Sequence, residues 1–339
     1  MNARRLLPLL ALAALAAACG AGGSGGRGEL ASLAELRGGT LGVASADSVA
    51  SLETRFVLQV AYELETGDRS ADVALVESPA DSLPELLLDR AIDAAVLPDR
   101  SAFQLTRGGQ GVYLLSHITE EMRELTGEPV LASALLTYPD VAATKPAALD
   151  ELNALLAESL TYFRANRDAV IDAVAVDAGE RAYLRWWWDR HDILYGDASA
   201  SVQAQLVDLW EAGRAVGDIE GYPDLASVLF DPQTQDTDGS NARSTVTLGV
   251  LDDPGRRCAL YAVEQAIVVS DAIDVNLTYL AATALQEAAV AKYFDVVEAT
   301  PLLVPLGIAG DLPLLVLSGG LQDLDGTLLF VRSARAQSD

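Results

Sequence analysis

The sequence predicts an α/β protein with two lobes, each a parallel-rich sheet flanked by helices, and an added helical layer. Short runs rich in Val, Leu and Thr alternate with helical segments of about ten to fifteen residues, a pattern typical of βαβ units and parallel sheets. This alternation occurs twice, over residues 30–138 and 245–332, and residues 139–230 lie between the two stretches. Two matched halves of similar length indicate two lobes with a cleft between them.

Length and charge limit the classes of partner. The chain has 339 residues, of which 50% are hydrophobic, enough for two domains with cores of their own. Its formal charge is −26, from 23 basic and 49 acidic residues. Nucleic acid and anionic membrane surfaces are therefore poor partners for the protein as a whole, because both repel an acidic protein.

The first 18 residues have the composition of a signal peptide. Two arginines precede an apolar run at residues 6–15, and three alanines lead to Cys19. The run is shorter than the roughly 20 residues that span a bilayer. A Cys directly after small residues resembles a bacterial lipoprotein signal, which implies cleavage before Cys19 and acylation of its thiol. Simple secretion is the alternative.

Residues 19–29 follow as the lipid-anchor site and a flexible tether, because Gly and Ser dominate them. With Cys19 acylated, Cys258 is the only thiol left, so no disulfide can form within one chain. Cys258 lies in an apolar helical run and is expected to be a buried core residue. A nucleophilic role is disfavoured, because the chain has only His117 and His191 as possible bases.

The first lobe, residues 30–138, is expected to begin with a short helix that a pair of glycines ends. Its strands are expected at residues 40–44, 72–77, 92–97 and 112–116, and its helices at 30–37, 49–65, 82–90, 98–108 and 119–126. The apolar run at 129–137 is expected to be a strand that crosses between the lobes.

The middle of the chain, residues 139–230, has no strand pattern and is expected to be an all-helical layer. Its helices are expected at 145–164, 168–176, 178–190 and 199–215, with a short one near residue 225. Residues 231–244, rich in Asp, Gln, Thr and Gly up to residue 241, are expected to form a linker loop.

The second lobe, residues 245–332, repeats the alternation of strands and helices. Its strand runs lie at 244–251, 274–280, 294–301, 314–318 and 327–332, and residues 317–322 are expected to form a turn. The polar tail, residues 333–339, is expected to be frayed.

Candidate ligand-binding residues follow from a rule for parallel sheets. Ligands bind at the carboxyl ends of the strands, where helix N-termini present free N–H groups. The rule selects four loops, and the candidates on them are Ser45, Asp47, Ser48, Pro98, Asp99, Arg100, Asp252, Asp253 and Thr300. For each of these residues, helix capping is the alternative role. No metal ligands and no cofactor are expected.

The charges of these loops bear on the ligand. Arg100 and Arg256 could hold an anion, but the loops carry more Asp than Arg. A neutral, hydrogen-bonding or cationic ligand is therefore favoured over nitrate or a sulfonate. Phe103, Tyr113 and Tyr279 could stack on a ligand, although each is expected in the core.

Three consecutive tryptophans, Trp186 to Trp188, lie in one predicted helix. Successive helical residues point about 100° apart, so at most two of the three rings can share a pocket. Helix packing is the expected role, and a ligand contact is the alternative.

Two stretches carry a family resemblance. Residues 36–43 (LRGGTLGV), with residues 86–98 (LLLDRAIDAAVLP), look like the second lobe of an ABC-transporter substrate-binding protein, closest to the group for sulfonates, taurine, nitrate or thiamine precursors. Residues 292–301 (KYFDVVEATP) resemble the matching stretch of the first lobe.

The resemblance implies a periplasmic binding protein type II-like fold in an extracytoplasmic lipoprotein. Such a protein captures a small molecule in the interlobe cleft and delivers it to an ABC transporter permease, as a monomer without a cofactor. It is lipid-anchored to the cell membrane, on the periplasmic or cell-surface side.

The lobes stand in reverse order compared with this family, because the stretch like the second lobe comes first. The order suggests circular permutation, and a truncated tandem copy is the alternative. An enzyme of cofactor biosynthesis on the same scaffold and a sensory binding domain are the other functions considered. The chain's two histidines, single free Cys and lack of a glycine-rich phosphate loop count against an enzyme, and Lys292 is a poor candidate for a Schiff base.

Overall fold

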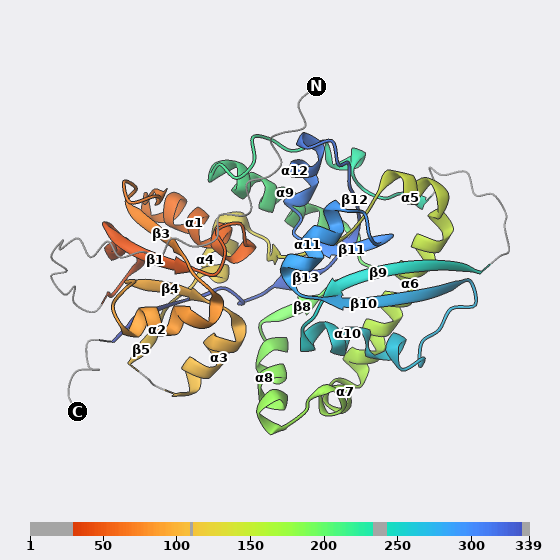
Figure 1. Ribbon diagram of the computed structural model, residues 1–339, viewed down its shortest axis with the longest axis horizontal. Helices are drawn as coiled ribbons and strands as arrows, with labels where there is room; N and C mark the ends of the chain where they lie inside the picture. The colour runs from red at the N-terminus through yellow and green to blue at the C-terminus, as the bar shows by residue number, and fades with distance from the viewer. Residues whose placement is uncertain (1–29, 109–110, 233–242, 334–339) are drawn as a thin grey trace.

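The computed structural model describes residues 30–108, 111–232 and 243–333. The predicted signal peptide, Cys19, the tether, most of the linker and the polar tail lie outside these residues. Two lobes lie side by side (Figure 1). Lobe A contains the six-stranded sheet of the first predicted half, and lobe B contains the five-stranded sheet of the second.

Lobe A is built on a sheet with the strand order β2-β3-β1-β4-β14-β5. The first four strands run parallel, and β14 runs antiparallel to both of its neighbours. The strands are β1 (Gly39–Val43), β2 (Thr66–Gly67), β3 (Val73–Glu77), β4 (Ala94–Leu97), β5 (Val112–His117) and β14 (Leu328–Arg332). Every residue of β4 is buried, as expected for a central strand covered on both faces.

Helices of lobe A connect these strands. They are the 3₁₀ turns η1 (Leu33–Leu36) and η2 (Ala80–Ser82) and the helices α1 (Val49–Tyr62), α2 (Leu83–Leu88), α3 (Asp99–Gly108) and α4 (Ile118–Thr126). The strands and helices predicted for this half are all present, with small shifts at their ends.

Lobe B is built on a sheet with the strand order β10-β9-β11-β7-β12. Here β10, β9 and β11 run parallel, and β7 runs antiparallel to β11 and β12. The strands are β7 (Ala134–Thr137), β9 (Ser244–Leu251), β10 (Ile273–Leu280), β11 (Val296–Ala299) and β12 (Leu315–Gly319), and the helices of this half are α10 (Pro254–Glu264), α11 (Ala282–Val290) and α12 (Leu303–Ala309).

The two lobes exchange one strand each. Apart from the edge strand β2, both sheets have the same order: second, first, third, an exchanged strand, then fourth. The exchanged strand of lobe B, β7, follows the first half of the chain, and that of lobe A, β14, ends the second half. The chain therefore crosses between the lobes twice, and the prediction of a crossing strand within residues 129–137 is confirmed.

A small third sheet lies where the crossings occur, with β13 (Leu321–Asp323) between β6 (Val130–Leu131) and β8 (His191–Ile193). It corrects two predictions. β8 interrupts the stretch expected to be all-helical, and β13 occupies the turn expected at 317–322. Both strands have only three residues, too few for a periodic pattern, and they form because they pair with each other.

The helical layer covers lobe B and joins it to lobe A. Its helices are α5 (Pro139–Thr144), α6 (Pro146–Ala165), α7 (Arg167–Val174), α8 (Ala178–Trp188) and α9 (Ala200–Ala215), followed by the 3₁₀ turn η3 (Leu225–Ser227). In α9, a Cβ on Gly213 would meet Leu302 of lobe B at 3.0 Å and Leu52 of lobe A at 3.5 Å. One apolar core therefore passes from lobe to lobe through α9. No described helix combines the length and the apolar character needed to cross a bilayer.

Candidate functional site

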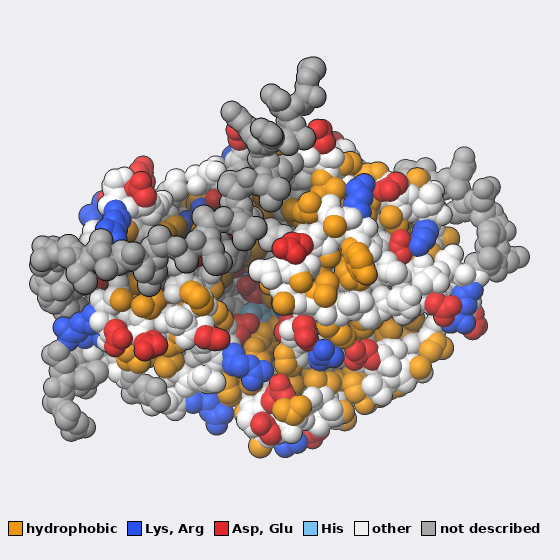
Figure 2. Space-filling model, in the orientation of Figure 1, with side chains coloured by type: hydrophobic (Ala, Val, Ile, Leu, Met, Phe, Trp, Pro, Cys, Tyr) orange, Lys and Arg blue, Asp and Glu red, His pale blue; other side chains and the backbone are white. Residues whose placement is uncertain are grey.

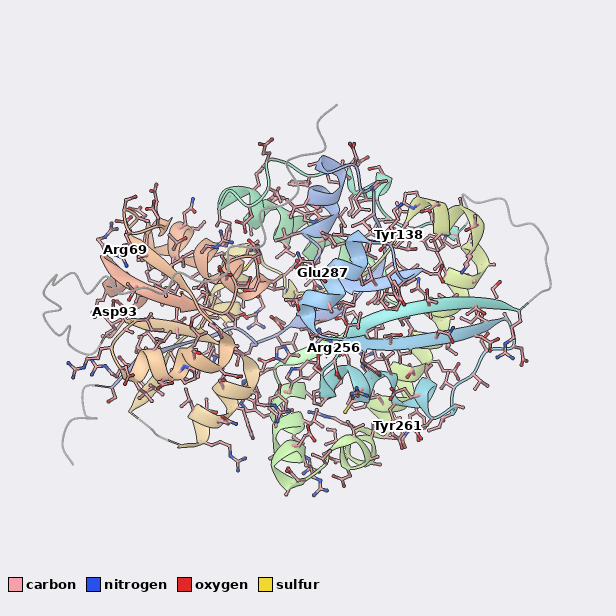
Figure 3. All side chains as sticks on the ribbon, viewed as in Figure 1. Arg69, Asp93, Tyr138, Arg256, Tyr261 and Glu287 are labelled. Atoms are coloured by element: carbon pink, nitrogen blue, oxygen red, sulfur yellow. The ribbon has the colours of Figure 1, made fainter. Side chains whose placement is uncertain are left out.

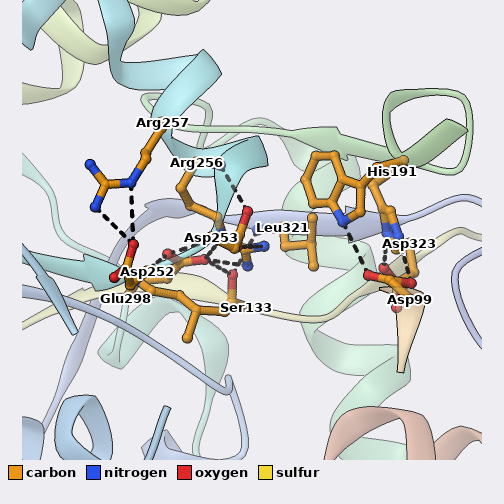
Figure 4. A network of polar contacts seen from close by, with 12 residues as sticks. Asp99, Ser133, His191, Asp252, Asp253, Arg256, Arg257, Glu298, Leu321 and Asp323 are labelled. Atoms are coloured by element: carbon orange, nitrogen blue, oxygen red, sulfur yellow. Dashed lines mark hydrogen bonds and ion pairs between the residues drawn. The ribbon is translucent and has the colours of Figure 1, made fainter. Parts of the chain in front are cut away.

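Polar side chains from both lobes meet in the middle of the molecule, where the space-filling surface is hollowed between the lobes (Figure 2). We call this group the interlobe cluster. It lies beside α3 of lobe A and α8 of the helical layer (Figure 1), which contact each other through the rings of Phe103 and Tyr183. Its members are Asp99, Trp187, His191, Asp253, Arg256, Glu298 and Asp323 (Figure 4).

Asp99 is the member that lobe A contributes. It is the first residue of α3, directly after the carboxyl end of β4, and Trp187 Nε1 donates a hydrogen bond of 3.0 Å to its Oδ2. His191 Nε2 lies 3.2 Å from its other oxygen, Oδ1. Burial raises the pKa of Asp99, but His191 and the hydrogen bonds from His191 and Trp187 lower it more, so the net pKa is below the ordinary value. Asp99 is therefore a carboxylate at neutral pH.

His191 stands between two carboxylates. Its ring lies on β8, is 3% exposed, and has Nδ1 2.6 Å from Asp323 Oδ1 and Nε2 directed to Asp99. Burial lowers the pKa of the imidazole, but the charges of Asp99 and Asp323 outweigh burial and raise the pKa to about 10. The ring is therefore an imidazolium at neutral pH, with one N–H donor for each carboxylate.

Arg256 organises the lobe B side of the cluster. It lies in the first turn of α10 and points into the middle of the molecule (Figure 3). Its Nη2 is 2.9 Å from Glu298 Oε1 and its Nη1 is 2.6 Å from Asp253 Oδ2. Glu298 also accepts hydrogen bonds from Ser133 Oγ at 2.5 Å and from Tyr195 Oη at 2.9 Å. These contacts pair the buried guanidinium of Arg256 with two carboxylates and give Glu298 several hydrogen-bond donors.

The two carboxylates beside Arg256 differ in pKa. Burial raises the pKa of Glu298, but the charge and hydrogen bonds of Arg256 lower it below the ordinary value. For Asp253, burial outweighs the attraction of Arg256, so its pKa is raised. Asp253 also caps α10 by accepting from the backbone N–H of Arg256 at 3.0 Å.

Trp187 links the two sides of the cluster. Its ring packs on the His191 ring with centroids 4.6 Å apart, and the Arg256 guanidinium lies 5.8 Å from its centroid. It also covers the first turn of α10 so closely that a Cβ on Gly255 would lie 2.5 Å from the ring. The indole therefore occupies the helix N-terminus where the rule for parallel sheets places a ligand.

Three predicted site residues lie in or beside the interlobe cluster. Asp99 and Asp253 approach it from opposite lobes. Arg100 forms an ion pair of 3.3 Å with Glu180 and stacks 4.3 Å from the centroid of Tyr183. These contacts run from lobe A to α8 of the helical layer.

The other predicted site residues have local contacts. Ser48 caps α1 by accepting from the backbone N–H of Ser51 at 3.2 Å, and Ser45 Oγ accepts from the N–H of Asp47, whose side chain is exposed. Asp252 pairs with Arg257 at 2.9 Å. Thr300 Oγ1 accepts from the N–H of Leu302 at 3.4 Å, and the carbonyl of Pro98 accepts from Ala102 at 2.9 Å in the first turn of α3.

Sequence reasoning did not place His191, Asp323 and Glu298 in the site. His191 and Asp323 lie on the short strands β8 and β13, which the sequence does not reveal. Trp187 was expected to pack its helix, with a ligand contact as the alternative. Its neighbours Trp186 and Trp188 do pack, against Phe103 with ring centroids 5.6 Å apart and against Phe163 at 4.3 Å. Among the described residues, no three or more His, Cys, Asp or Glu side chains are grouped so that they could hold a metal ion.

Comparison with known proteins gives no family. No protein-family model and no curated protein matches the chain. Among solved structures, YhfZ from Shigella flexneri is 9% identical with a TM-score of 0.27, covering 86% of this chain and 82% of its own. The periplasmic murein tripeptide-binding protein MppA, in its unliganded open form, is 11% identical with a TM-score of 0.29, covering 77% of this chain, which spans 53% of the MppA chain.

A third solved structure is the alkanesulfonate-binding protein SsuA from Xanthomonas axonopodis pv. citri, bound to MOPS. It is 13% identical with a TM-score of 0.31, covering 91% of this chain and 68% of its own. Scores this low carry no argument about the fold or the ligand. The two-lobed architecture rests on the chain's own strand order.

Proposed function

We propose that this protein is an extracytoplasmic solute-binding protein that captures a small molecule between its lobes and delivers it to an ABC importer. The observation that supports this proposal most is the exchange of β7 and β14 between two lobes of the same strand order. Asp99 after β4 and Asp253 after β9 then both belong to the interlobe cluster, on the carboxyl edges where α/β sheets bind ligands.

Lobe motion has a natural direction in this fold. On one side the lobes are joined by apolar packing around α9, which is costly to expose to water. On the other side, Arg100 forms a partly exposed ion pair with Glu180, which exchanges for water at little cost. The remaining contacts there are the pair of Asp99 with the buried His191 and the packing of Phe103 on Tyr183 and Trp186. We therefore expect the cleft to open between α3 and α8, with the α9 side acting as the hinge.

Catalysis is not part of the proposal. Burial raises the pKa of the Cys258 thiol to about 12, so a thiolate nucleophile is not available at neutral pH. Both nitrogens of His191 face carboxylates, which keep the ring protonated and remove its capacity to act as a base. Lys292 is partly exposed and lies 3.6 Å from Asp140, so its amine has no buried setting that would activate it.

The proposed location of the protein in the cell follows from the first 19 residues. Cleavage before Cys19 and acylation of its thiol would anchor the protein on the extracytoplasmic face of the membrane, and the Gly-rich tether would let both lobes stand clear of the lipid. Cys19→Ser is expected to move the protein from the membrane fraction to the soluble fraction. Unchanged membrane fractionation would contradict the anchor.

A thermal-shift screen of the chain from Gly20 onward tests the binding function. The panel contains sulfonates, nitrate, pyrimidines, amines, amino acids and simple carboxylates. A ligand at a hundred times its Kd adds about 2.7 kcal/mol to the stability, which raises Tm by a few degrees. We expect a shift with one chemical class and no turnover on long incubation. A folded sample that no class stabilises, or that consumes its ligand, would contradict the proposal.

A further inference from the structure

The groups that contact the carboxylate of Asp99 come from outside lobe A. The indole N–H of Trp187 donates a hydrogen bond of 3.0 Å to Asp99 Oδ2, and Nε2 of His191 lies 3.2 Å from Asp99 Oδ1 in an ion pair without hydrogen-bond geometry. Both donors come from α8 and β8, whereas Asp99 comes from lobe A. We call these two N–H groups the anion clamp.

The anion clamp is held in place by groups other than Asp99. Asp323 lies 2.6 Å from Nδ1 of His191, fixes the ring orientation and directs the Nε2–H away from itself. Trp187 is 2% exposed and is confined by Gly255 on α10 and by the His191 ring. Both donors therefore keep their directions when lobe A moves away.

The N–H groups favour an anion at the position of Asp99. The charge of His191 is offset by Asp323 and that of the more distant Arg256 by Glu298 and Asp253, so an anion there meets chiefly the N–H groups of Trp187 and His191. An ammonium group at that position would lie beside an imidazolium and face two hydrogen-bond donors with nothing to accept its own protons. The pattern of acidic loops favoured a neutral or cationic ligand, but the geometry here favours the opposite charge.

We infer that the anion clamp is a carboxylate-binding subsite, which Asp99 fills when the lobes are together and which a ligand's carboxylate fills in its place. The clamp itself is independent of the proposed transport function, and only the identity of the natural ligand as a carboxylate-bearing molecule rests on that function. Asp99 then acts as a built-in competitor that covers the site until a ligand displaces it.

Chemical rescue tests the inference. Asp99→Ala removes the carboxylate and leaves room for formate, so formate should raise the Tm of this variant by a few degrees while wild type gains almost nothing. Ionic strength is held constant with chloride. Asp47→Ala, which changes an exposed Asp of a neighbouring loop, is the matched control and should behave as wild type. Adding Trp187→Phe to Asp99→Ala should abolish the rescue.

A second variant covers the case in which Asp99→Ala fails to fold. Asp99→Asn keeps the shape of the side chain, but its amide brings N–H groups against the clamp donors, so formate should stabilise this variant more than wild type as well. Equal formate shifts in wild type and both variants, or rescue by methylammonium instead of formate, would overturn the inference. Formate rescue without any hit in the ligand screen would leave the anion clamp standing and remove the transport function.

Discussion

Glu53 is a carboxyl group on α1 with no exposed surface, and it lies near the interlobe cluster. One of its oxygens accepts a hydrogen bond of 2.8 Å from Thr119. Burial, and then the charge of Asp323, raises the pKa of Glu53 well above its ordinary value. Since the unfolded chain has the ordinary pKa, the folded protein loses stability as the pH rises from the unfolded pKa through the folded one.

Glu53→Gln should remove this loss of stability. The amide oxygen still accepts from Thr119, and the side chain carries no charge at any pH. The Tm of the variant minus that of wild type is therefore expected to be small near about pH 4 and to grow toward about pH 9, measured by thermal unfolding. Glu287→Gln, at an exposed position of α11 (Figure 3), is the control with a flat difference. A pH-independent difference for Glu53→Gln would contradict a raised pKa.

Substitutions of Arg256 and of its neighbour Arg257 compare the stability cost of breaking a buried ion pair with that of breaking an exposed one. Arg256→Met leaves the buried carboxylate of Glu298 and the partly exposed carboxylate of Asp253 without their partner, which should cost about 3–5 kcal/mol. Arg257→Met breaks a partly exposed pair with Asp252 and should cost no more than about 1 kcal/mol. Urea unfolding measures both. Arg256→Met with Glu298→Gln should recover part of the loss, and a double variant no more stable than Arg256→Met would contradict this account.

At the residue scale, the sequence could identify site residues only where a strand end is visible. Asp99, Arg100 and Asp253 follow strands that the hydrophobic pattern reveals, so the rule for parallel sheets finds them. His191 and Asp323 lie on strands whose pairing involves residues more than a hundred positions apart. No local sequence pattern can reveal a pairing between such distant residues. The role of Trp187 in the cluster could not be predicted either, because it depends on contacts with His191 and Asp99.

At the scale of elements, a residue that caps a helix can also belong to the candidate site. Asp177 and Ser48 cap α8 and α1 through bonds to backbone N–H groups, and Asp253 does the same for α10 while it also binds Arg256. The alternation of hydrophobic runs predicted the long elements well, because their cores are continuous. The run at 129–137 was expected to cross between the lobes, but no pattern predicted that β14 lies in the sheet of the opposite lobe.

Ser48→Ala should destabilise the protein by about 1 kcal/mol, because α1 loses the acceptor for its Ser51 N–H. Ser45→Ala removes only an acceptor within the preceding loop and should cost less. Urea midpoints compare the two variants. Ligand binding should be unchanged by Ser48→Ala if capping is its whole role, and a large loss of affinity with normal stability would give Ser48 a place in the ligand site.

At the scale of the molecule, both ends of the described chain lie beside the beginning of β5. Tyr113 Oη donates to the carbonyl oxygen of Leu30, and the N–H of Ser333 donates to the carbonyl of Gly111 at 2.7 Å. We propose that the chain is a circular permutation of the lobe order found in ABC-transporter substrate-binding proteins, the family that the sequence resembles. The first and last described residues both contact residues 111–113, so the two ends lie close together. A fold tolerates circular permutation when its chain ends lie close together.

A reconnected chain tests the permutation. The variant starts at Arg243, runs to Ser333, continues through a short Gly-Ser linker to Leu30 and ends at Pro232. Its lobes then stand in the order of the family, and we expect the same Tm within a few degrees and the same ligand response. A reconnected chain that does not fold cooperatively would favour an independent origin of the order.

The exchange of β14 also sets the order in which the protein can be completed during synthesis. The other strands of lobe A are made first, yet its sheet also needs residues 328–332, which follow all the strands of lobe B in the sequence. Until then β4 and β5 lack the strand between them, and their open edges can pair with other chains. Pairing across nearly the whole sequence is also slow to form. Lobe A therefore cannot be completed before the strands of lobe B have been made.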